Sequence, residues 1–286
     1  MKYLNIKSRA KINLTLDICG KRDDGYHDIE TIMQTLNFCD NIYILKTGKE
    51  GIKLKTNLSW LPSDSSNIAY KAAKLIMDEY SIKSGVFIEL SKRIPVSAGL
   101  AGGSGNAAAV LKGMNKLFEL NISKDKLMEY ALMLGSDVPY MLLGKTAKAT
   151  GRGEVLTKLA NMPSCRVVLA KPRINVSTAF VYKNFDMSSV CQRPDTKAMI
   201  SAIENSDIKG IAANLCNVLE SVTLKAYPII GEIKTRLVEN GALGALMSGS
   251  GPTVFGMFEN KDTAEAASLD IKKRFNIKDV YVVSIF

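Results

Sequence analysis

The chain has 286 residues, of which 47% are hydrophobic and 23% charged, and its formal net charge is +10. This composition is usual for a globular protein with a substantial core, and the length allows one large domain or two of ordinary size. It excludes a membrane-spanning chain, because no apolar run is long enough, and a metal site built from several histidines, because His27 is the only one.

The charge and the cysteines indicate the setting of the protein. Lysine and arginine are scattered, without a block of five or more like charges, so a nucleic-acid surface is disfavoured and a polyanionic small substrate is compatible. The five cysteines are odd in number and lack the spacing of a zinc or redox site, which is typical of a reduced cytoplasmic chain. The N-terminus has no continuous apolar segment that would suggest export.

In chain order, the first part of the sequence indicates strands. Residues 10–18 and 40–47 alternate or run apolar, and the polar segment 20–27 between them predicts a turn. After a break rich in proline and serine, residues 68–80 carry apolar side chains at helical spacing, with Asn67 or a neighbouring serine as the N-cap.

A glycine-rich stretch follows the strand expected at 86–90. Residues 95–109 read PVSAGLAGGSGNAAA and precede a helix that we expect to begin at Asn106. Glycine lacks Cβ, so backbone N–H groups can approach an anion, and a helix start adds unpaired N–H groups and the positive end of the dipole. The stretch therefore suggests a phosphate-binding loop, with a compact loop beneath the helix as the alternative. It matches neither the Walker A nor the Rossmann pattern.

Further helices and strands complete the chain. Residues 124–134 predict a helix with Ser123 as cap and Gly135 as stop, and a short helix restarts within 135–144. The second half predicts helices over strands, in the manner of a split βαβ sandwich. We expect strands at 165–172, 241–249, 253–259 and 279–286, and helices near 196–205, 208–222, 229–240 and 261–274. We place the domain boundary so that the domains are 1–160 and 161–286.

Four blocks of sequence resemble, in the same order, the motifs of the GHMP small-molecule kinases. Residues 95–109 resemble the family's P-x-x-x-G-L-x-G-G-S-x-N-A-A signature, and residues 241–256 resemble its third motif. Residues 10–36, with K-I-N-L and G-x-R-x-D-G-Y-H, and residues 135–154 resemble the member that phosphorylates the 2-hydroxyl of a methylerythritol carrying cytidine diphosphate. The resemblance covers nearly the whole chain.

The resemblance implies a fold and an activity. The fold is α+β, with an N-terminal ATP-binding domain of the ribosomal-protein-S5-like type, a C-terminal ferredoxin-like domain and an active site in the cleft between them. The activity is phosphoryl transfer from ATP with Mg²⁺, in the non-mevalonate route to isoprenoid precursors. Besides its small-molecule substrate the protein would need neither nucleic acid nor membrane, and it would be a monomer or homodimer.

Three alternatives compete with this reading. Another GHMP kinase, of the homoserine or mevalonate type, would share the motifs, but its acceptor has no base to stack on Tyr26 and His27. A non-catalytic binding protein on the same fold has no reason to keep both Lys11 and Asp137. A nucleic-acid binder would rest on the net charge alone.

The resemblance assigns the chemistry to Lys11 and Asp137. Phosphoryl transfer depends on positioning and charge stabilisation. Asp137 would act as general base on the acceptor hydroxyl, and Lys11 would keep it ionised and offset developing negative charge. Without the resemblance, Asp137 reads as a helix N-cap and Lys11 as a strand-end lysine that reaches solvent.

The resemblance also assigns the nucleotide site. The loop residues that would hold the ATP phosphates are Pro95, Val96, Ser97, Ala98, Gly99, Leu100, Ala101, Gly102, Gly103, Ser104, Gly105 and Asn106. Asn67 and Lys92 match positions near the nucleotide base, although Asn67 reads equally as a helix cap. Ala101 and Gly105 stand where the family often has Gly and Ser. We expect the backbone approach to survive the methyl group of Ala101, and Ser104 to be the hydroxyl that reaches Mg²⁺.

The acceptor side is assigned to four residues. Tyr26 and His27 follow a DG turn, and the resemblance places both against a cytosine, where an aromatic ring stacks and an imidazole hydrogen-bonds. Tyr182 matches an aromatic residue on the other face of the cytosine, and Asn13 would give a polar contact to the substrate. A histidine that caps the turn is the alternative for His27.

Overall fold

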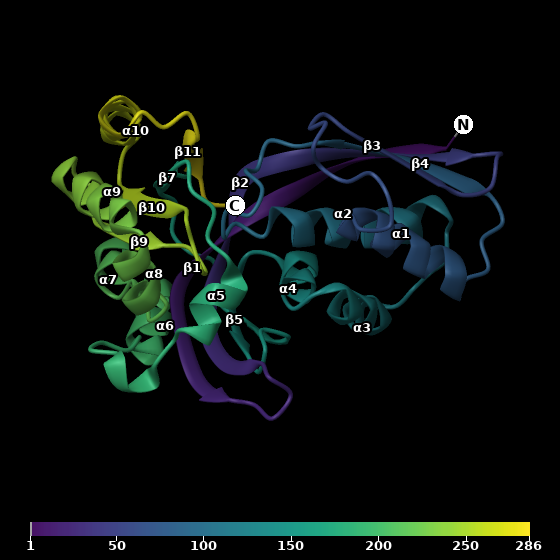
Figure 1. Cartoon of the computed structure of the whole chain (residues 1–286). Coiled ribbons are helices and arrows are strands. Elements are labelled where there is room, and N and C mark those ends of the chain that lie inside the picture. Colours follow the sequence, from purple (N-terminus) through teal and green to yellow (C-terminus); the bar gives the residue numbers. More distant parts are fainter. Residues whose placement is uncertain (1) are drawn as a thin grey trace. The chain divides into compact units, whose positions relative to one another are not determined.

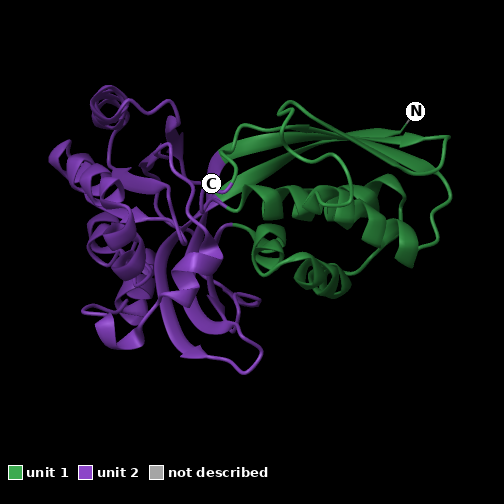
Figure 2. Ribbon diagram, viewed as in Figure 1, with its two compact units in different colours: residues 1–10, 38–96, 101–144 green, residues 11–37, 97–100, 145–286 purple. Residues whose placement is uncertain are grey.

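The structure, a computed structural model, describes residues 2–286 and contains two compact units (Figure 2). Unit 1 comprises the segment up to Ala10, Phe38–Val96 and Ala101–Gly144. Unit 2 comprises Lys11–Asn37, Ser97–Leu100 and Lys145–Phe286. These units differ from the two halves expected from the sequence, because the two longest strands, β1 (Tyr3–Lys21) and β2 (His27–Thr47), each continue from one unit into the other.

Unit 1 is a sheet covered by helices. Its strands lie in the order β3 (Ile52–Thr56), β4 (Gly85–Ser91), β2 and β1, with β4 antiparallel to β2 and parallel to β3. Helices α1 (Ile68–Glu79), α2 (Gly102–Leu117), α3 (Lys124–Leu134) and α4 (Asp137–Leu143) lie on one side of this sheet (Figure 1). Apolar side chains of the strands, such as Ile44 and Ile88, pack there against Ile76 and Val110 of the helices.

The helix boundaries of unit 1 mostly follow the sequence. Asn67 is the N-cap of α1, Ser123 is the N-cap of α3, and α3 ends at Gly135, as predicted. The prediction for α2 was wrong at its start, because the helix begins at Gly102 and not at Asn106. Gly102 and Gly105 pack closely against neighbouring segments, and this packing outweighs their low helix propensity.

Unit 2 contains a four-stranded antiparallel sheet in the order β11 (Val280–Ser284), β7 (Arg166–Ala170), β10 (Val254–Phe258) and β9 (Gly244–Met247). Helices α9 (Pro228–Glu239) and α10 (Lys261–Phe275) cover it and share its core (Figure 1). The rest of β1 and β2 pairs within unit 2 with β8 (Cys216–Asn217) and β5 (Thr146–Thr150) respectively, and β5 pairs with β6 (Val155–Lys158). The remaining helical segments are α5 (Thr178–Lys183), η1 (Met187–Ser189), α6 (Thr196–Glu204), α7 (Ile208–Ala213) and α8 (Glu220–Ala226).

The prediction of one long helix at 208–222 in the second half was wrong. The structure ends α7 at Ala213, forms the short strand β8 and starts α8 only at Glu220. Asn217 lies in this break, and its side-chain NH₂ donates to the carbonyl oxygens of Met247 and Gly249, at 2.8 Å each. These long-range contacts outweigh the local helical pattern. No helix among residues 2–286 combines the length and the hydropathy needed to cross a membrane.

Candidate active site

The two glycine-rich loops touch each other within unit 2. Ser248 Oγ, in the loop between β9 and β10, donates to the carbonyl oxygen of Gly99 at 2.9 Å, although the two residues are 149 apart in sequence. Gly99 has a φ of +74°, and a Cβ there would lie 2.2 Å from Ser248 O. The contact therefore requires glycine at position 99.

The strand that carries Lys11 meets the same loop. The backbone N–H of Lys11 donates to Leu100 O at 3.1 Å. In the other loop, the position of a Cβ on Gly249 lies 3.5 Å from Asn13 Oδ1. Unit 2 thus gathers two glycine loops beside the start of the strand segment that contains Lys11 and Asn13.

Lys11 is buried, with 4% of its surface exposed. Its Nζ donates to Asn13 Oδ1 at 2.7 Å, and Asn13 Nδ2 donates in turn to Thr31 Oγ1 at 2.9 Å. The alternative reading of Lys11 as a lysine that reaches solvent is therefore wrong. A buried ammonium needs polar partners, and here the strand pair β1–β2 supplies them.

Asp137 belongs to unit 1 and is half-buried. It is the first residue of α4, whose N-cap is Ser136, so the reading of Asp137 as the N-cap is wrong. A pairing of Asp137 with Lys11 stays a prediction.

The start of α2 has the form of an anion site. Ala101, its N-cap, has the left-handed conformation with φ 52° and ψ 30°, and no side chain caps the helix. Because no side chain accepts from the first N–H groups of α2, these groups are not blocked by a cap and can meet an anion. Ser104 is half-buried in this first turn, and Gly103 is exposed.

The packing around position 105 explains why a glycine stands there. A Cβ at this position would lie 2.7 Å from Ser8 Oγ and 2.9 Å from Arg9 O. We expect Gly105→Ala to lower the free energy of unfolding by about 1–3 kcal/mol because the neighbouring strand must shift. Gly103→Ala is the control for stability: its Cβ would have room, 3.7 Å from Ile68 Cγ2, and helix propensity favours alanine by up to about 1 kcal/mol. Chemical denaturation measures both, and equal stabilities would contradict the clash.

The two residues expected near the nucleotide base are already held by the chain. Asn67 Oδ1 accepts from the backbone N–H of Ala69 at 2.9 Å, and its NH₂ donates to Pro62 O at 2.7 Å. The ammonium of Lys92 pairs with Asp40 and donates to Asn106 Oδ1 at 3.0 Å. Sequence reasoning missed Asp40, although a carboxylate at the start of an apolar strand segment is an unusual feature.

Aromatic side chains gather at the predicted acceptor site in unit 2. The rings of His27 and Tyr182 have centroids 5.4 Å apart and are tilted by 44°. Tyr26 is 54% exposed, and the guanidinium of Arg152 lies 4.8 Å from its ring centroid. Arg152 was not among the predicted residues, although it lies within the block at 135–154. The structure thus brings His27 and Tyr182 together and adds a cation beside Tyr26.

The turn before Tyr26 is held by its own charges. Asp24 Oδ1 accepts from the backbone N–H of Tyr26 at 3.1 Å, and Arg22 pairs with Asp24 and Asp28. The backbone N–H of Tyr26 and the guanidinium of Arg22 lower the pKa of Asp24 below its ordinary value. Gly25, with φ +83°, completes the turn. Tyr26 is thereby held directly after a defined turn, and His27 begins β2.

No group of three or more His, Cys, Asp or Glu side chains that could hold a metal ion is present among residues 2–286. Mg²⁺ usually keeps several waters and binds one or two protein oxygens together with substrate phosphates. Ser104, half-buried in the first turn of α2, carries a hydroxyl oxygen of the kind that such a shared site would use.

Two family models match the chain. The model of the GHMP kinases N terminal domain matches residues 67–145, and that of the GHMP kinases C terminal matches residues 199–277. The chain belongs to the GHMP kinases. The matched segments include the loop at 95–106 and Asp137, and members of this family use ATP as phosphoryl donor.

Individual members of the family are similar to this chain along nearly its whole length. The chain is 50% identical, over 92% of its length and 93% of theirs, to the 4-diphosphocytidyl-2-C-methyl-D-erythritol kinase of Acetivibrio thermocellus. A crystal structure of 4-(cytidine 5'-diphospho)-2C-methyl-D-erythritol kinase matches with TM-score 0.85 and 30% identity over 99% of both chains. A homoserine kinase from Cytophaga hutchinsonii matches with TM-score 0.80 and 20% identity, covering all of this chain and 95% of the other, which indicates a shared fold. The expected α+β GHMP kinase fold is confirmed.

Proposed function

We propose that this GHMP kinase transfers the γ-phosphoryl group of ATP to the 2-hydroxyl of 4-diphosphocytidyl-2-C-methyl-D-erythritol, giving ADP and the 2-phosphate. The reaction belongs to the non-mevalonate synthesis of isoprenoid precursors. The observation that carries the proposal is the 50% identity, over nine-tenths of both chains, to a kinase of that name. The ring contact between His27 and Tyr182 supports it, because this acceptor presents a flat base.

In this proposal Asp137 takes the proton of the acceptor hydroxyl, and Lys11 stabilises the charge that develops on the transferred group. The contact of Lys11 with Asn13 supports this role, because it holds the ammonium in one place. The acceptor's cytosine binds at Tyr26, His27 and Tyr182.

The ATP phosphates bind at the loop 95–106 and the start of α2, and Asn67 and Lys92 support the region near the base through their contacts within the chain. The uncapped first turn of α2 supports this assignment, since its N–H groups and dipole attract anions. Mg²⁺, when bound, would neutralise charge on the phosphates. Ser104, in that same turn, would hold it from the protein side.

The alternative is another GHMP acceptor of the homoserine or mevalonate type, because the fold accommodates such kinases. The rings of His27 and Tyr182 favour an acceptor with a base.

We further propose that the enzyme works in the cytoplasm as a monomer or homodimer, without nucleic acid or membrane. Its five cysteines, which are all free thiols, suit a reducing compartment.

The function is tested by incubating the full chain with Mg-ATP and a panel of acceptors while ADP formation is measured. We expect ADP to form with 4-diphosphocytidyl-2-C-methyl-D-erythritol and not with homoserine or mevalonate. Preferred turnover of either of the latter would establish the alternative. ADP formation with none of the three would contradict the proposal.

Tyr182→Ala is expected to raise KM for the cytidylyl acceptor by about tenfold, with kcat little changed, because stacking on one base contributes about 1–3 kcal/mol. Phe180→Ala is the matched control, because Phe180 is an exposed aromatic residue on the same helix, α5. Steady-state kinetics at saturating ATP measures both variants. An unchanged KM in Tyr182→Ala, or an equal rise in Phe180→Ala, would remove Tyr182 from the cytosine site.

A further inference from the structure

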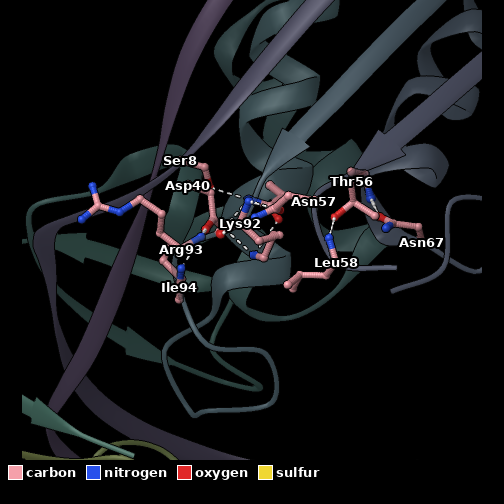
Figure 3. Close-up of polar contacts among 11 residues, drawn as sticks. Ser8, Asp40, Thr56, Asn57, Leu58, Asn67, Lys92, Arg93 and Ile94 are labelled. Atoms are coloured by element: carbon pink, nitrogen blue, oxygen red, sulfur yellow. Dashed lines mark hydrogen bonds and ion pairs between the residues drawn. The ribbon is translucent and has the colours of Figure 1, made fainter. Parts of the chain in front are cut away.

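Asp40 is fully buried in unit 1 (Figure 3), directly before the segment of β2 that pairs with β4. Its Oδ1 accepts two backbone N–H groups, from Arg93 at 2.7 Å and from Ile94 at 2.9 Å. Its Oδ2 accepts from the ammonium of Lys92 and from Asn106 Nδ2, the latter at 2.9 Å. One carboxylate therefore has four donors, which is how a buried charge is tolerated.

These donors flank the glycine loop on both sides. Arg93 and Ile94 directly precede Pro95, where the loop begins, and Asn106 follows Gly105 in the first turns of α2. Asp40 thus holds the residues that lead into the loop and a residue that leads out of it. Since Asp40 has no exposed surface, it cannot meet a ligand itself.

The other members of the cluster extend this anchor. The backbone of Lys92 is held by Asn57, which accepts the Lys92 N–H at 2.8 Å and donates to the Lys92 carbonyl at 3.1 Å (Figure 3). Asn106 Nδ2 also donates to Ser8 Oγ on β1 at 3.0 Å. The ammonium of Lys92 lies 3.2 Å from the position of a Cβ on Gly102, so the first residue of α2 packs directly on the ion pair.

We propose that Asp40 is a positioning residue for nucleotide binding: it fixes both flanks of the loop 95–105, so that the first turn of α2 is held ready for the phosphates. Lys92 acts through Asp40 and Asn106, and its ammonium does not bond to ATP. This inference rests on the proposed role of the loop as an ATP-phosphate site.

Asp40→Asn separates the two flanks. The asparagine keeps an oxygen for the N–H groups of Arg93 and Ile94, but its NH₂ faces the ammonium of Lys92 and the NH₂ of Asn106, so donors oppose donors. We expect KM for ATP to rise at least about tenfold and KM for the acceptor to change by less than about twofold, because misplaced binding groups weaken one substrate selectively.

The matched control is Asn115→Ala, at the other end of α2. Asn115 accepts from the backbone N–H of Ile122 at 2.9 Å and donates to its carbonyl at 3.1 Å, so this variant also loses partly buried polar contacts of the helix. Both variants are expected to lower Tm, but only Asp40→Asn should raise KM for ATP. Equal KM values for ATP in the wild type and Asp40→Asn, or a matching rise in Asn115→Ala, would overturn the proposal.

A second measurement keeps the inference testable if Asp40→Asn yields little folded enzyme. Ser8→Ala removes the link from Asn106 to β1 and keeps the ion pair. Amide hydrogen exchange of residues 95–105 should be faster in Ser8→Ala than in Asn115→Ala, and equal exchange would overturn the anchoring.

Calorimetry with Mg-ADP gives a readout that needs no acceptor. Weaker Mg-ADP binding by Asp40→Asn would support the positioning role even if the wild type failed to phosphorylate the proposed substrate.

Discussion

Asp137→Asn is expected to lower kcat by at least about a hundredfold, because the amide cannot take the proton of the acceptor hydroxyl. The substitution keeps the size and shape of the side chain at the first position of α4, so the helix should remain. The affinity for ATP, measured by calorimetry with Mg-ADP, should change little, since the general base acts on the acceptor. Steady-state kcat at saturation with both substrates gives the comparison.

Asp125→Asn is the control for this prediction. Asp125 is an exposed acidic residue in the first turn of α3, in the same unit. Both substitutions remove a carboxylate that interacts favourably with a helix N-terminus, which contributes about 0.3–1 kcal/mol to stability. Asp125→Asn should keep the wild-type kcat. A near-normal kcat in Asp137→Asn would leave Asp137 with only the helix-terminus role.

Gly99→Ala is expected to separate the two glycine loops of unit 2 and to abolish most activity. The new Cβ would lie 2.2 Å from Ser248 O and 3.2 Å from Gly251 O, both of them backbone atoms that cannot rotate away. The left-handed conformation at φ +74° costs alanine about 1–2 kcal/mol, and the overlap adds about 1–3 kcal/mol. Denaturant unfolding should show the loss of stability, and ADP formation should show the loss of turnover.

Gly231→Ala separates this effect from the general consequence of replacing a glycine in unit 2. Gly231 lies within α9, and its Cβ would meet only Leu224, at 3.7 Å or more. Alanine there should stabilise the helix by up to about 1 kcal/mol. Wild-type stability and turnover in Gly99→Ala would mean that the contact between Ser248 and Gly99 has no part in holding the loops.

The sequence predicted the capped helices and alternating strands well, because their signals are local. Asn67, Ser123 and Gly135 delimit helices through hydrogen bonds and backbone conformations that involve only near neighbours. The pattern failed at 208–222, where Asn217 binds carbonyl oxygens about thirty residues away and interrupts the helix. It also failed at the start of α2, where packing on Lys92 and Ser8 makes a helix of glycines that have low propensity for one.

The candidate site divides in the same way. The motifs at 10–36, 95–109, 135–154 and 241–256 were sufficient to indicate a GHMP kinase, because several motifs in the same order are specific to a family. The roles of the individual residues stay predictions. The roles of Arg152 and Asp40 were not predicted, because no local sequence pattern identifies the residues that they contact. Arg152 meets Tyr26 across the chain, and Asp40 meets Asn106 by way of a strand and a helix.

The sequence by itself determined the family, the α+β class and most helix and strand positions, through motif order and through hydrophobic periodicity. Only the tertiary structure decided that Lys11 is buried against Asn13, that Gly99 must be glycine to meet Ser248, and that Gly105 must be glycine to clear Ser8 and Arg9. It also decided that one carboxylate, Asp40, holds both flanks of the glycine loop. The physical reason is that burial, steric overlap and charge pairing depend on atoms that folding brings together. The positions of these residues along the chain do not reveal such tertiary contacts.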